Sequence, residues 1–195
     1  MVSAGPAADR FGAIPRSPAQ TRILSAALDL FAVHGVSATS LQMIADAVGV
    51  GKAAIYFQFK TKDEIVIAVT ETQLARFEDA LDAAEASEDR AGARELLLNR
   101  MIDIAVEQRN IVSILQFDPV IIRLLVEHKP FRQFLERLYV ALIGEEPGPE
   151  RLVQAAMLSG GIGSAVRHQL VAQLDDDTLR SELLKLTRRL IGLPE

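Results

Sequence analysis

Residues 41–57, LQMIADAVGVGKAAIYF, decide the fold of this chain. They place a small residue at Ala45, a glycine at Gly49 and a β-branched residue at Ile55, the fifth, ninth and fifteenth positions of the stretch. This pattern suits a helix-turn-helix, because two helices approach closely at the small residue, the turn becomes left-handed at the glycine, and the β-branched side chain closes the core. An ordinary αα-hairpin satisfies the same spacing, so the spacing alone leaves both interpretations open.

Side-chain caps mark three helix starts around this stretch. In a capping box, a Ser or Thr hydroxyl accepts a hydrogen bond from the backbone N–H three residues on, and the side chain at that position returns one. The candidate boxes are Ser17-Pro18-Ala19-Gln20, Thr39-Ser40-Leu41-Gln42 and Thr61-Lys62-Asp63-Glu64. They predict a first helix that ends at Gly35, a second that ends at Gly49, and a long one that reaches Ala86.

Helical periodicity continues through the rest of the chain. Alternating β-branched residues and Asn-Gly hairpin turns are missing, so we predict an all-α protein of about nine helices. Pro130 is expected to kink or divide its helix. A short helix is expected over residues 52–57, and the later ones over residues 90–108, 110–117, 119–143, 149–173 and 176–192.

Composition narrows the classes of protein that the chain fits. Its 195 residues are 49% hydrophobic and include no cysteine, which excludes disulfides and thiolate metal sites. No apolar run suits a transmembrane helix or a signal peptide, which predicts a cytoplasmic protein without a membrane partner. The net charge is −5, but residues 1–70 carry +1 and residues 71–195 carry −6. The charge of residues 1–70 therefore does not exclude binding to a nucleic acid.

From Thr21 to Val69 the chain closely resembles the DNA-binding domain of the TetR family of bacterial transcriptional regulators. The matching features are AAxxLF ending at Phe31, the His34-Gly35 turn, the Ala38-Thr39 pair, IAxxxGV at Ile44–Val50 and IYFxFxxK at Ile55–Lys62. The remaining two-thirds matches that family only in length and helical character. The resemblance implies an N-terminal three-helix helix-turn-helix domain followed by a helical domain for effector binding and dimerisation.

Three parts of the chain follow from these observations. Residues 1–17 are rich in small and turn-forming residues and are expected to form a flexible arm. Residues 18–62 would be the DNA-binding domain, and residues 63–195 the effector-binding and dimerisation domain. The resemblance implies a repressor that binds a palindromic, double-stranded DNA operator as a homodimer and is released by a small hydrophobic effector.

Candidate DNA contacts follow from residue type and place in the motif. A short helix with small residues at its start can enter the major groove, and a lysine there can reach guanine or a phosphate. The predicted base-reading residues are Gln42, Lys52, Ala53 and Ala54. The predicted phosphate contacts are Thr39, Ser40, Tyr56, Gln58 and Lys62, which supply hydroxyl, amide or ammonium groups near helix starts.

Several of these residues have an alternative role. Gln42 could close its capping box instead of reading a base, Tyr56 could be part of the core, and Lys60 suits a solvated charge. Where many family members carry Ser, Thr and His, this chain has Gly51, Ala54 and Gln58. The operator sequence therefore cannot be transferred from the family.

The last two predicted helices suggest a dimerisation surface. Glycines within a helix cost about 1 kcal/mol each relative to alanine, a cost that close helix–helix packing can offset. The alternative is a helix break at a pocket wall. The predicted interface residues are Gly160, Gly161, Ser164, Leu179, Leu183, Leu186 and Leu190.

An apolar pocket for a small hydrophobic or aromatic effector is expected in the C-terminal domain. Its predicted lining is Phe77, Met101, Ile104, Phe117, Phe134, Leu138, Tyr139 and Met157. The same residues also suit ordinary core packing, because Met and Phe at helical spacing are typical of a core.

No enzyme signature stands out, so we expect a non-enzyme without cofactor or metal. Val48-Gly49-Val50-Gly51-Lys52 lacks the first P-loop glycine and the following Ser or Thr. The run Asp175-Asp176-Asp177 precedes a predicted helix and is more simply an N-terminal cap than a metal site. The alternative function is a DNA-binding factor that is controlled by a protein partner or has no small-molecule effector.

Overall fold

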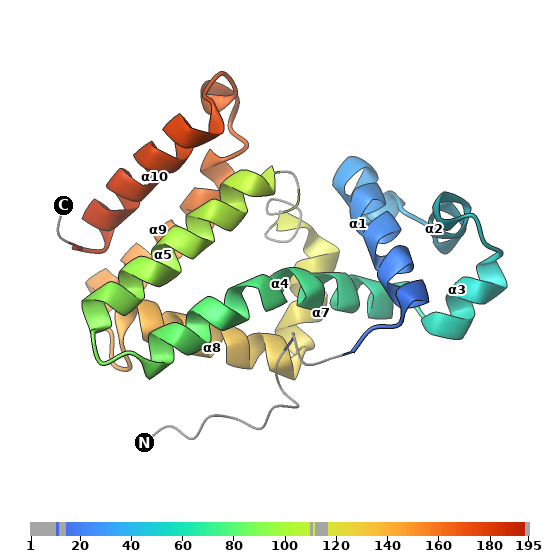
Figure 1. Ribbon diagram of the computed structural model, residues 1–195, viewed down its shortest axis with the longest axis horizontal. Coiled ribbons are helices and arrows are strands. Elements are labelled where there is room, and N and C mark those ends of the chain that lie inside the picture. Colours follow the sequence, from blue (N-terminus) through green and yellow to red (C-terminus); the bar gives the residue numbers. More distant parts are fainter. Residues whose placement is uncertain (1–10, 12–14, 110, 112–116, 194–195) are drawn as a thin grey trace. The chain divides into compact units, whose positions relative to one another are not determined.

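The computed structural model describes residues 11, 15–109, 111 and 117–193, which form helices and no strands (Figure 1). The α-helices are α1 (Pro18–Ala38), α2 (Leu41–Val48), α3 (Lys52–Gln58), α4 (Lys62–Ala86), α5 (Arg90–Glu107), α7 (Pro119–Glu127), α8 (Lys129–Ile143), α9 (Pro149–Ala165) and α10 (Asp176–Leu190), with a 3₁₀ turn η3 (Gln169–Val171). The predicted all-α fold is confirmed. The helix predicted over residues 110–117 lies outside the described part, apart from residues 111 and 117.

The chain forms two compact units. The first contains the residues up to Glu78 together with residues 117–132, and the second contains residues 79–116 and 133–195. The first two-thirds of α4, to Glu78, belongs to the first unit, where its apolar residues Ile65, Val66 and Val69 are buried. This division by packing differs from the predicted division by function, which separates the domains at residue 62.

Local sequence signals explain how α1 begins and ends. The Ser17 hydroxyl accepts from the Gln20 backbone and the Gln20 side chain accepts from the Ser17 backbone, so this predicted capping box is confirmed. Gly35 has φ 76° and ψ 164°, which interrupts the helix where the sequence predicts its end. Only a short further turn follows to Ala38. Phe31 and Val36 on either side of this break are buried.

The described residues of the predicted arm are not free. Phe11 is buried, and Arg16 forms an ion pair with Glu71 of α4 at 2.6 Å. Residues 1–10 and 12–14 of the predicted flexible arm lie outside the described residues.

Proline placement divides the middle of the chain as expected. Asp118 caps α7, and Pro119 occupies the first turn of that helix. The predicted helix over residues 119–143 is divided at His128, and Pro130 lies in the first turn of α8, where its missing N–H has no cost. The next predicted helix is also shorter than expected, because α9 ends at Ala165.

In the second unit α10 packs along α5 (Figure 1). Leu179, Leu183 and Thr187 are the buried residues of α10. Part of the leucine stripe predicted for dimerisation is thus used within the chain: Leu179 and Leu183 are only 2% and 8% exposed. Their assignment to a dimer interface is wrong, because the spacing of the stripe does not reveal which helix covers it.

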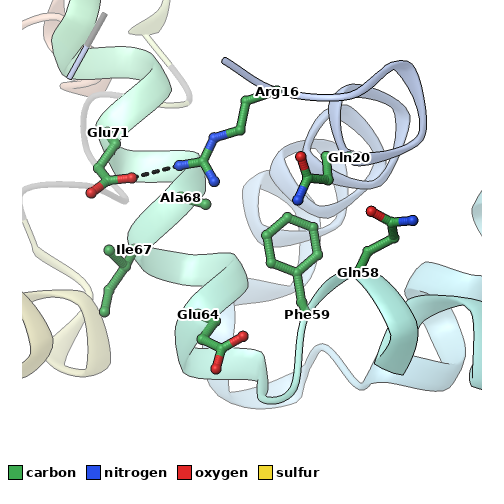
Figure 2. Close-up of a pocket in the computed structure, with 8 residues that line it drawn as sticks. All are labelled: Arg16, Gln20, Gln58, Phe59, Glu64, Ile67, Ala68 and Glu71. Carbon is green, nitrogen blue, oxygen red and sulfur yellow. Dashed lines mark hydrogen bonds and ion pairs between the residues drawn. The ribbon is translucent and has the colours of Figure 1, made fainter. Parts of the chain in front are cut away.

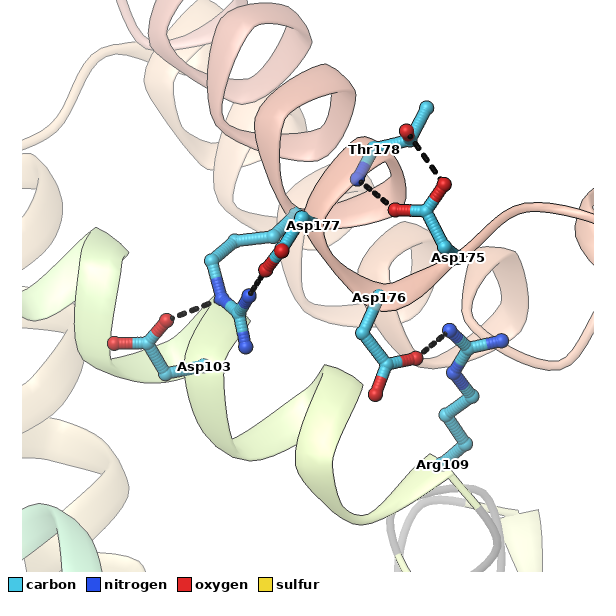
Figure 3. Close-up of polar contacts among 7 residues, drawn as sticks. Asp103, Arg109, Asp175, Asp176, Asp177 and Thr178 are labelled. Carbon is cyan, nitrogen blue, oxygen red and sulfur yellow. Dashed lines mark hydrogen bonds and ion pairs between the residues drawn. The ribbon is translucent and has the colours of Figure 1, made fainter.

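The acidic run caps α10, as predicted (Figure 3). The Asp175 carboxylate accepts hydrogen bonds from the Thr178 backbone and hydroxyl, at 2.8 and 2.9 Å. The backbone hydrogen bond from Thr178 is the main reason why the pKa of Asp175 lies below its ordinary value. Asp176 pairs with Arg109, and Asp177 pairs with Arg180. Within the described residues, no group of acidic or histidine side chains is arranged to hold a metal ion.

No helix in the described part of the chain combines the length and apolar character needed to cross a membrane.

Candidate DNA interface

The α2–turn–α3 segment has the geometry of a helix-turn-helix. Gly49 adopts the left-handed conformation with φ 77° and ψ 35°, and the N–H groups of Gly49 and Val50 donate to the last carbonyls of α2. Ile44, Ala45 and Ile55 are fully buried. The small residue, the glycine and the β-branched residue therefore perform the tasks that the sequence pattern predicts.

Burying Ile55 fixes which side of α3 faces solvent. Lys52, Ala53 and Ala54 are all exposed, as a base-reading surface requires. Tyr56 is 42% exposed, so it is not purely a core residue. The ammonium of Lys52 lies 5.7 Å from the centre of the Tyr56 ring, a cation–π contact that holds the lysine at the start of the helix.

Phe57 is a feature of this surface that the sequence analysis did not single out. Its side chain is 78% exposed on α3. The signal was available, because Phe57 lies two residues from the buried Ile55 and α3 is too short to bury both sides. An exposed aromatic ring beside two alanines can contact thymine methyl groups in a major groove.

The second predicted capping box is wrong by one residue. Ser40 is the N-cap of α2, and its hydroxyl accepts from the Met43 N–H at 3.1 Å. Thr39 is 1% exposed, and its hydroxyl donates to the Gly35 carbonyl at 2.8 Å. Thr39 therefore does not suit the predicted phosphate contact, whereas the exposed Ser40 keeps that possibility.

Gln42 does not close a capping box either. Its side-chain amide donates to the Asp46 carboxylate at 2.7 Å, one turn further along α2. Both residues are exposed. The contact leaves the Gln42 carbonyl oxygen available, so base reading by Gln42 stays a prediction.

Lys62 has a different role in this structure from the predicted one. Its ammonium donates to the carbonyls of Val36 at 2.9 Å, Thr39 at 3.1 Å and Ser37 at 3.5 Å. An ammonium group has three donors, so these contacts use all of them. Lys62 at the start of α4 thus caps the end of α1 and supports the turn before α2.

Lys60 and the third cap fix the passage from α3 to α4. The Lys60 ammonium donates to the Tyr56 carbonyl at 3.2 Å, so it is more than a solvated charge. The Thr61 hydroxyl accepts from the Glu64 N–H at 3.1 Å, as predicted. The Glu64 carboxylate accepts from the Lys60 N–H at 2.7 Å, one residue before the expected partner.

Asp118 was also missed, although it anchors the helix-turn-helix from a distant part of the sequence. Its carboxylate accepts from the Val36 N–H at 3.1 Å and from the Val120 N–H at 2.9 Å. The start of α7 is thus fixed to the break at Gly35 within α1, in the first unit. Only its position as a helix cap could be read from the sequence, because the contact spans 82 residues.

A hollow of about 310 Å³ lies beside the end of α3 and the start of α4 (Figure 2). Gln58 lines it and is half-buried, which leaves part of its amide open to a phosphate. At its margin the Glu71 carboxylate accepts from Arg16 at 2.6 Å and contacts the His128 ring nitrogen Nε2 at 2.9 Å. This buried carboxylate joins the segment before α1, the helix α4 and the end of α7.

The residues predicted to line an effector pocket are not gathered in one unit. Phe77 and Phe117 belong to the first unit and the other six to the second. Met157 is 57% exposed on α9, one helical turn from Gly160 and Gly161, and its place in a pocket stays a prediction. Phe117 is 49% exposed. Ile104, Phe134 and Leu138 are buried, which also suits the core packing that the sequence left open.

Comparisons with known proteins agree with this geometry. A family model of bacterial regulatory proteins, the tetR family, matches residues 23–69. The HTH-type transcriptional repressor Rv3405c of Mycobacterium tuberculosis (strain ATCC 25618 / H37Rv) is 33% identical over 154 residues, which cover 70% of this chain and 81% of that protein. The chain belongs to the TetR family. As a member of this family it is a transcriptional regulator, and the resemblance inferred from the sequence is confirmed.

Two further relatives either match over a smaller part of their length or share less sequence with this chain. The HTH-type transcriptional regulator AcrR of Shigella flexneri is 34% identical over 90 residues, which span 45% of this chain but only 42% of AcrR. The transcriptional regulator FadR of Bacillus subtilis, solved in complex with stearoyl-CoA, superposes with a TM-score of 0.63 over 90% of this chain and 99% of FadR. At 18% identity that likeness shows the TetR-family fold alone.

Proposed function

We propose that this TetR-family regulator is a repressor that binds a palindromic operator as a homodimer through α2 and α3. The exposed surface of α3 carries the proposal, because buried Ile55 turns Lys52, Ala53, Ala54 and Phe57 toward solvent together. Lys52 would read guanine, and the two alanines would contact thymine methyl groups. Gln42 would add a base contact from the neighbouring helix.

Phosphate contacts would come from the margins of this surface. Ser40 at the start of α2, Tyr56 on α3 and half-buried Gln58 present hydroxyl or amide groups. Lys62 is reassigned from phosphate contact to helix cap, because three carbonyls already accept its donors. With few cations at the surface, the salt dependence of DNA binding would be modest for each subunit.

The homodimer would form through the exposed face of α9. Val153, Met157, Gly161 and Ser164 are exposed there, and a side chain at Gly160 or Gly161 would meet nothing within 4 Å. Nothing within the described chain therefore requires these glycines. Close approach of a second copy supplies the reason for them.

A small apolar or aromatic effector would release the operator. The apolar composition of the second unit favours such a ligand, and its fold relative FadR was solved with stearoyl-CoA. Differential affinity of the effector for the free and DNA-bound forms is sufficient, since about 1–3 kcal/mol of coupling gives 5–150-fold control. Stearoyl-CoA, a free fatty acid and an aromatic acid form the first panel of probes, scored by thermal shift and by release of DNA.

One observation favours the second candidate, a DNA-binding factor controlled by a protein partner or by no effector. Two of the residues expected to line the pocket, Phe117 and Met157, are about half exposed, and none of the eight lines the hollow beside α3 or a second hollow within the second unit. Specific release of DNA by any probe of the panel would argue against this candidate.

Selection of bound duplexes from a random DNA library tests the proposal, with purified protein at two salt concentrations. A palindromic motif with half-sites about one helical turn apart is expected. Lys52→Ala should change the preferred base at one position of each half-site. Arg22→Ala, at an exposed position of α1, is the matched control and should leave the preferred sequence unchanged. Enrichment of no sequence at either salt concentration would contradict sequence-specific binding by the protein alone.

A further inference from the structure

A second hollow, of about 380 Å³, lies wholly within the second unit. Its lining consists of Arg90, Arg94, Val140, Ala141, Gly144, Glu145 and Arg151, and we call it the arginine hollow. Three arginine residues thus line one small space together with one glutamate. The unit around it is acidic overall, since its residues 79–116 and 133–195 carry a net charge of −6. A concentration of positive charge here is therefore not a consequence of general composition.

Two of the arginines are fixed by the end of α8. The Arg94 Nε donates to the Leu142 carbonyl at 2.7 Å, and its terminal nitrogen donates to the Ile191 carbonyl at 3.4 Å. Arg151 donates to the Ile143 carbonyl at 3.1 Å. Each guanidinium has five N–H donors, so both keep unused donors after these contacts.

The third arginine has no such explanation. Arg90 is the first residue of α5, is exposed, and makes no side-chain hydrogen bond or ion pair with the described residues. No carboxylate among those residues pairs with Arg90, Arg94 or Arg151. Other arginines of the same unit behave differently, since Arg109, Arg137 and Arg180 each pair with at least one carboxylate.

The charges in the arginine hollow act on one another. Partial burial and, after it, the nearby charge of Arg151 lower the pKa of Arg94 below its ordinary value. Burial disfavours the charged form of the Arg94 guanidinium, and the positive charge of Arg151 repels it. An anion between the guanidinium groups would remove the repulsion and gain charge-assisted hydrogen bonds from their unused donors.

We propose that the arginine hollow binds a small oxyanion, a phosphate or carboxylate group, through Arg90, Arg94 and Arg151. Planar guanidinium groups bind both kinds of group through paired hydrogen bonds. Glu145 also lines the hollow, and its carboxylate would compete with the ligand because it carries the same charge. The site is separate from the DNA-binding surface, so this proposal does not rest on the proposed repressor function.

Phosphate binding to the DNA-free protein tests the site, measured by isothermal titration calorimetry at constant ionic strength with chloride as reference. Arg90→Gln should weaken binding of inorganic phosphate about tenfold, because one charged donor is lost. Glu145→Gln should strengthen it by several-fold. Arg22→Gln, on the exposed side of α1 in the first unit, should leave it unchanged. Adenosine monophosphate in a parallel titration distinguishes free phosphate from the phosphate of a larger ligand.

Opposite shifts in the two variants of the arginine hollow separate a site from a general effect of salt. The Arg90 side chain makes no hydrogen bond or ion pair with the described residues, so Arg90→Gln is expected to leave the protein folded. Equal phosphate affinity in wild type, Arg90→Gln and Glu145→Gln would overturn the proposal. So would the absence of any heat from phosphate, adenosine monophosphate and citrate, the last being the probe for carboxylates.

Discussion

Helices α3 and α9 both expose small and apolar side chains, but the charges beside them differ. On α3, Ala53, Ala54 and Phe57 lie between Lys52 and Lys60. On α9 the exposed face includes Val153, Met157 and Gly161. No charged residue occurs between Arg151 and Arg167.

This difference in charge fits the two roles proposed for these helices. DNA is a polyanion, so a surface that reads base edges needs cations at its margins to hold the phosphates. A second copy of the same chain carries the same charges, so an isologous contact is best made by an uncharged face. Apolar exposure alone does not distinguish the two kinds of partner. The charged residues beside the apolar side chains, present near α3 and absent between Arg151 and Arg167, do distinguish them.

The largest effect is expected from a charge on α9. Gly161→Arg should lower the dimerisation constant by at least about a hundredfold, since a desolvated, unpaired charge at such a contact costs several kcal/mol. The isolated chain should be stabilised by about 1 kcal/mol, because arginine favours a helix more than glycine and meets nothing within 4 Å. Sedimentation velocity and thermal unfolding measure both.

Val33→Arg, at an exposed apolar position of α1, is the control for this charge. It should leave the oligomeric state unchanged. A dimer of normal affinity in Gly161→Arg would show that the α9 face is not the interface.

Lys62→Met separates a helix cap from a phosphate contact. Three carbonyls lose their donor, so the first unit should be destabilised by about 1–3 kcal/mol. Below the melting temperature, the slope of DNA affinity against salt should stay at the wild-type value. A slope smaller by about 1 for each subunit would instead identify a phosphate contact.

Phe57→Ala examines the apolar part of the DNA-binding surface. Because the ring is 78% exposed, the change should leave stability within about 0.5 kcal/mol. Affinity for the selected operator should fall by about three- to tenfold if the ring contacts base edges. Fluorescence anisotropy with operator and with an unrelated duplex measures this. An equal loss on both duplexes would contradict a role in specificity.

Gly51→Ser should have the smallest effect. Gly51 caps α3 without a side-chain hydrogen bond, and a side chain there would meet nothing within 4 Å. A serine hydroxyl should stabilise α3 by a few tenths of a kcal/mol, about the difference between these residues as caps. Thermal unfolding at several denaturant concentrations can resolve the shift, and a lower melting temperature would show that the serine does not cap the helix.

Local signals in the sequence determined much of this protein. The capping box at Ser17, the left-handed Gly49 and the buried positions Ala45 and Ile55 each depend on residues a few positions apart. Their energetics are therefore almost independent of the rest of the chain. The fold class, the helix-turn-helix and the family follow from such signals.

Only the tertiary structure decided what covers each helix face. Periodicity put Leu179 and Leu183 on one stripe, but packing of α10 on α5 buries both of them within the chain. Thr39 and Lys62 donate to carbonyls at the break in α1, those of Gly35 and Val36, which a list of residue types cannot reveal. The helical periodicity of a sequence shows which residues lie on the same side of a helix. The burial of that side, and the hydrogen bonds that its polar groups then need, depend on segments distant in the sequence.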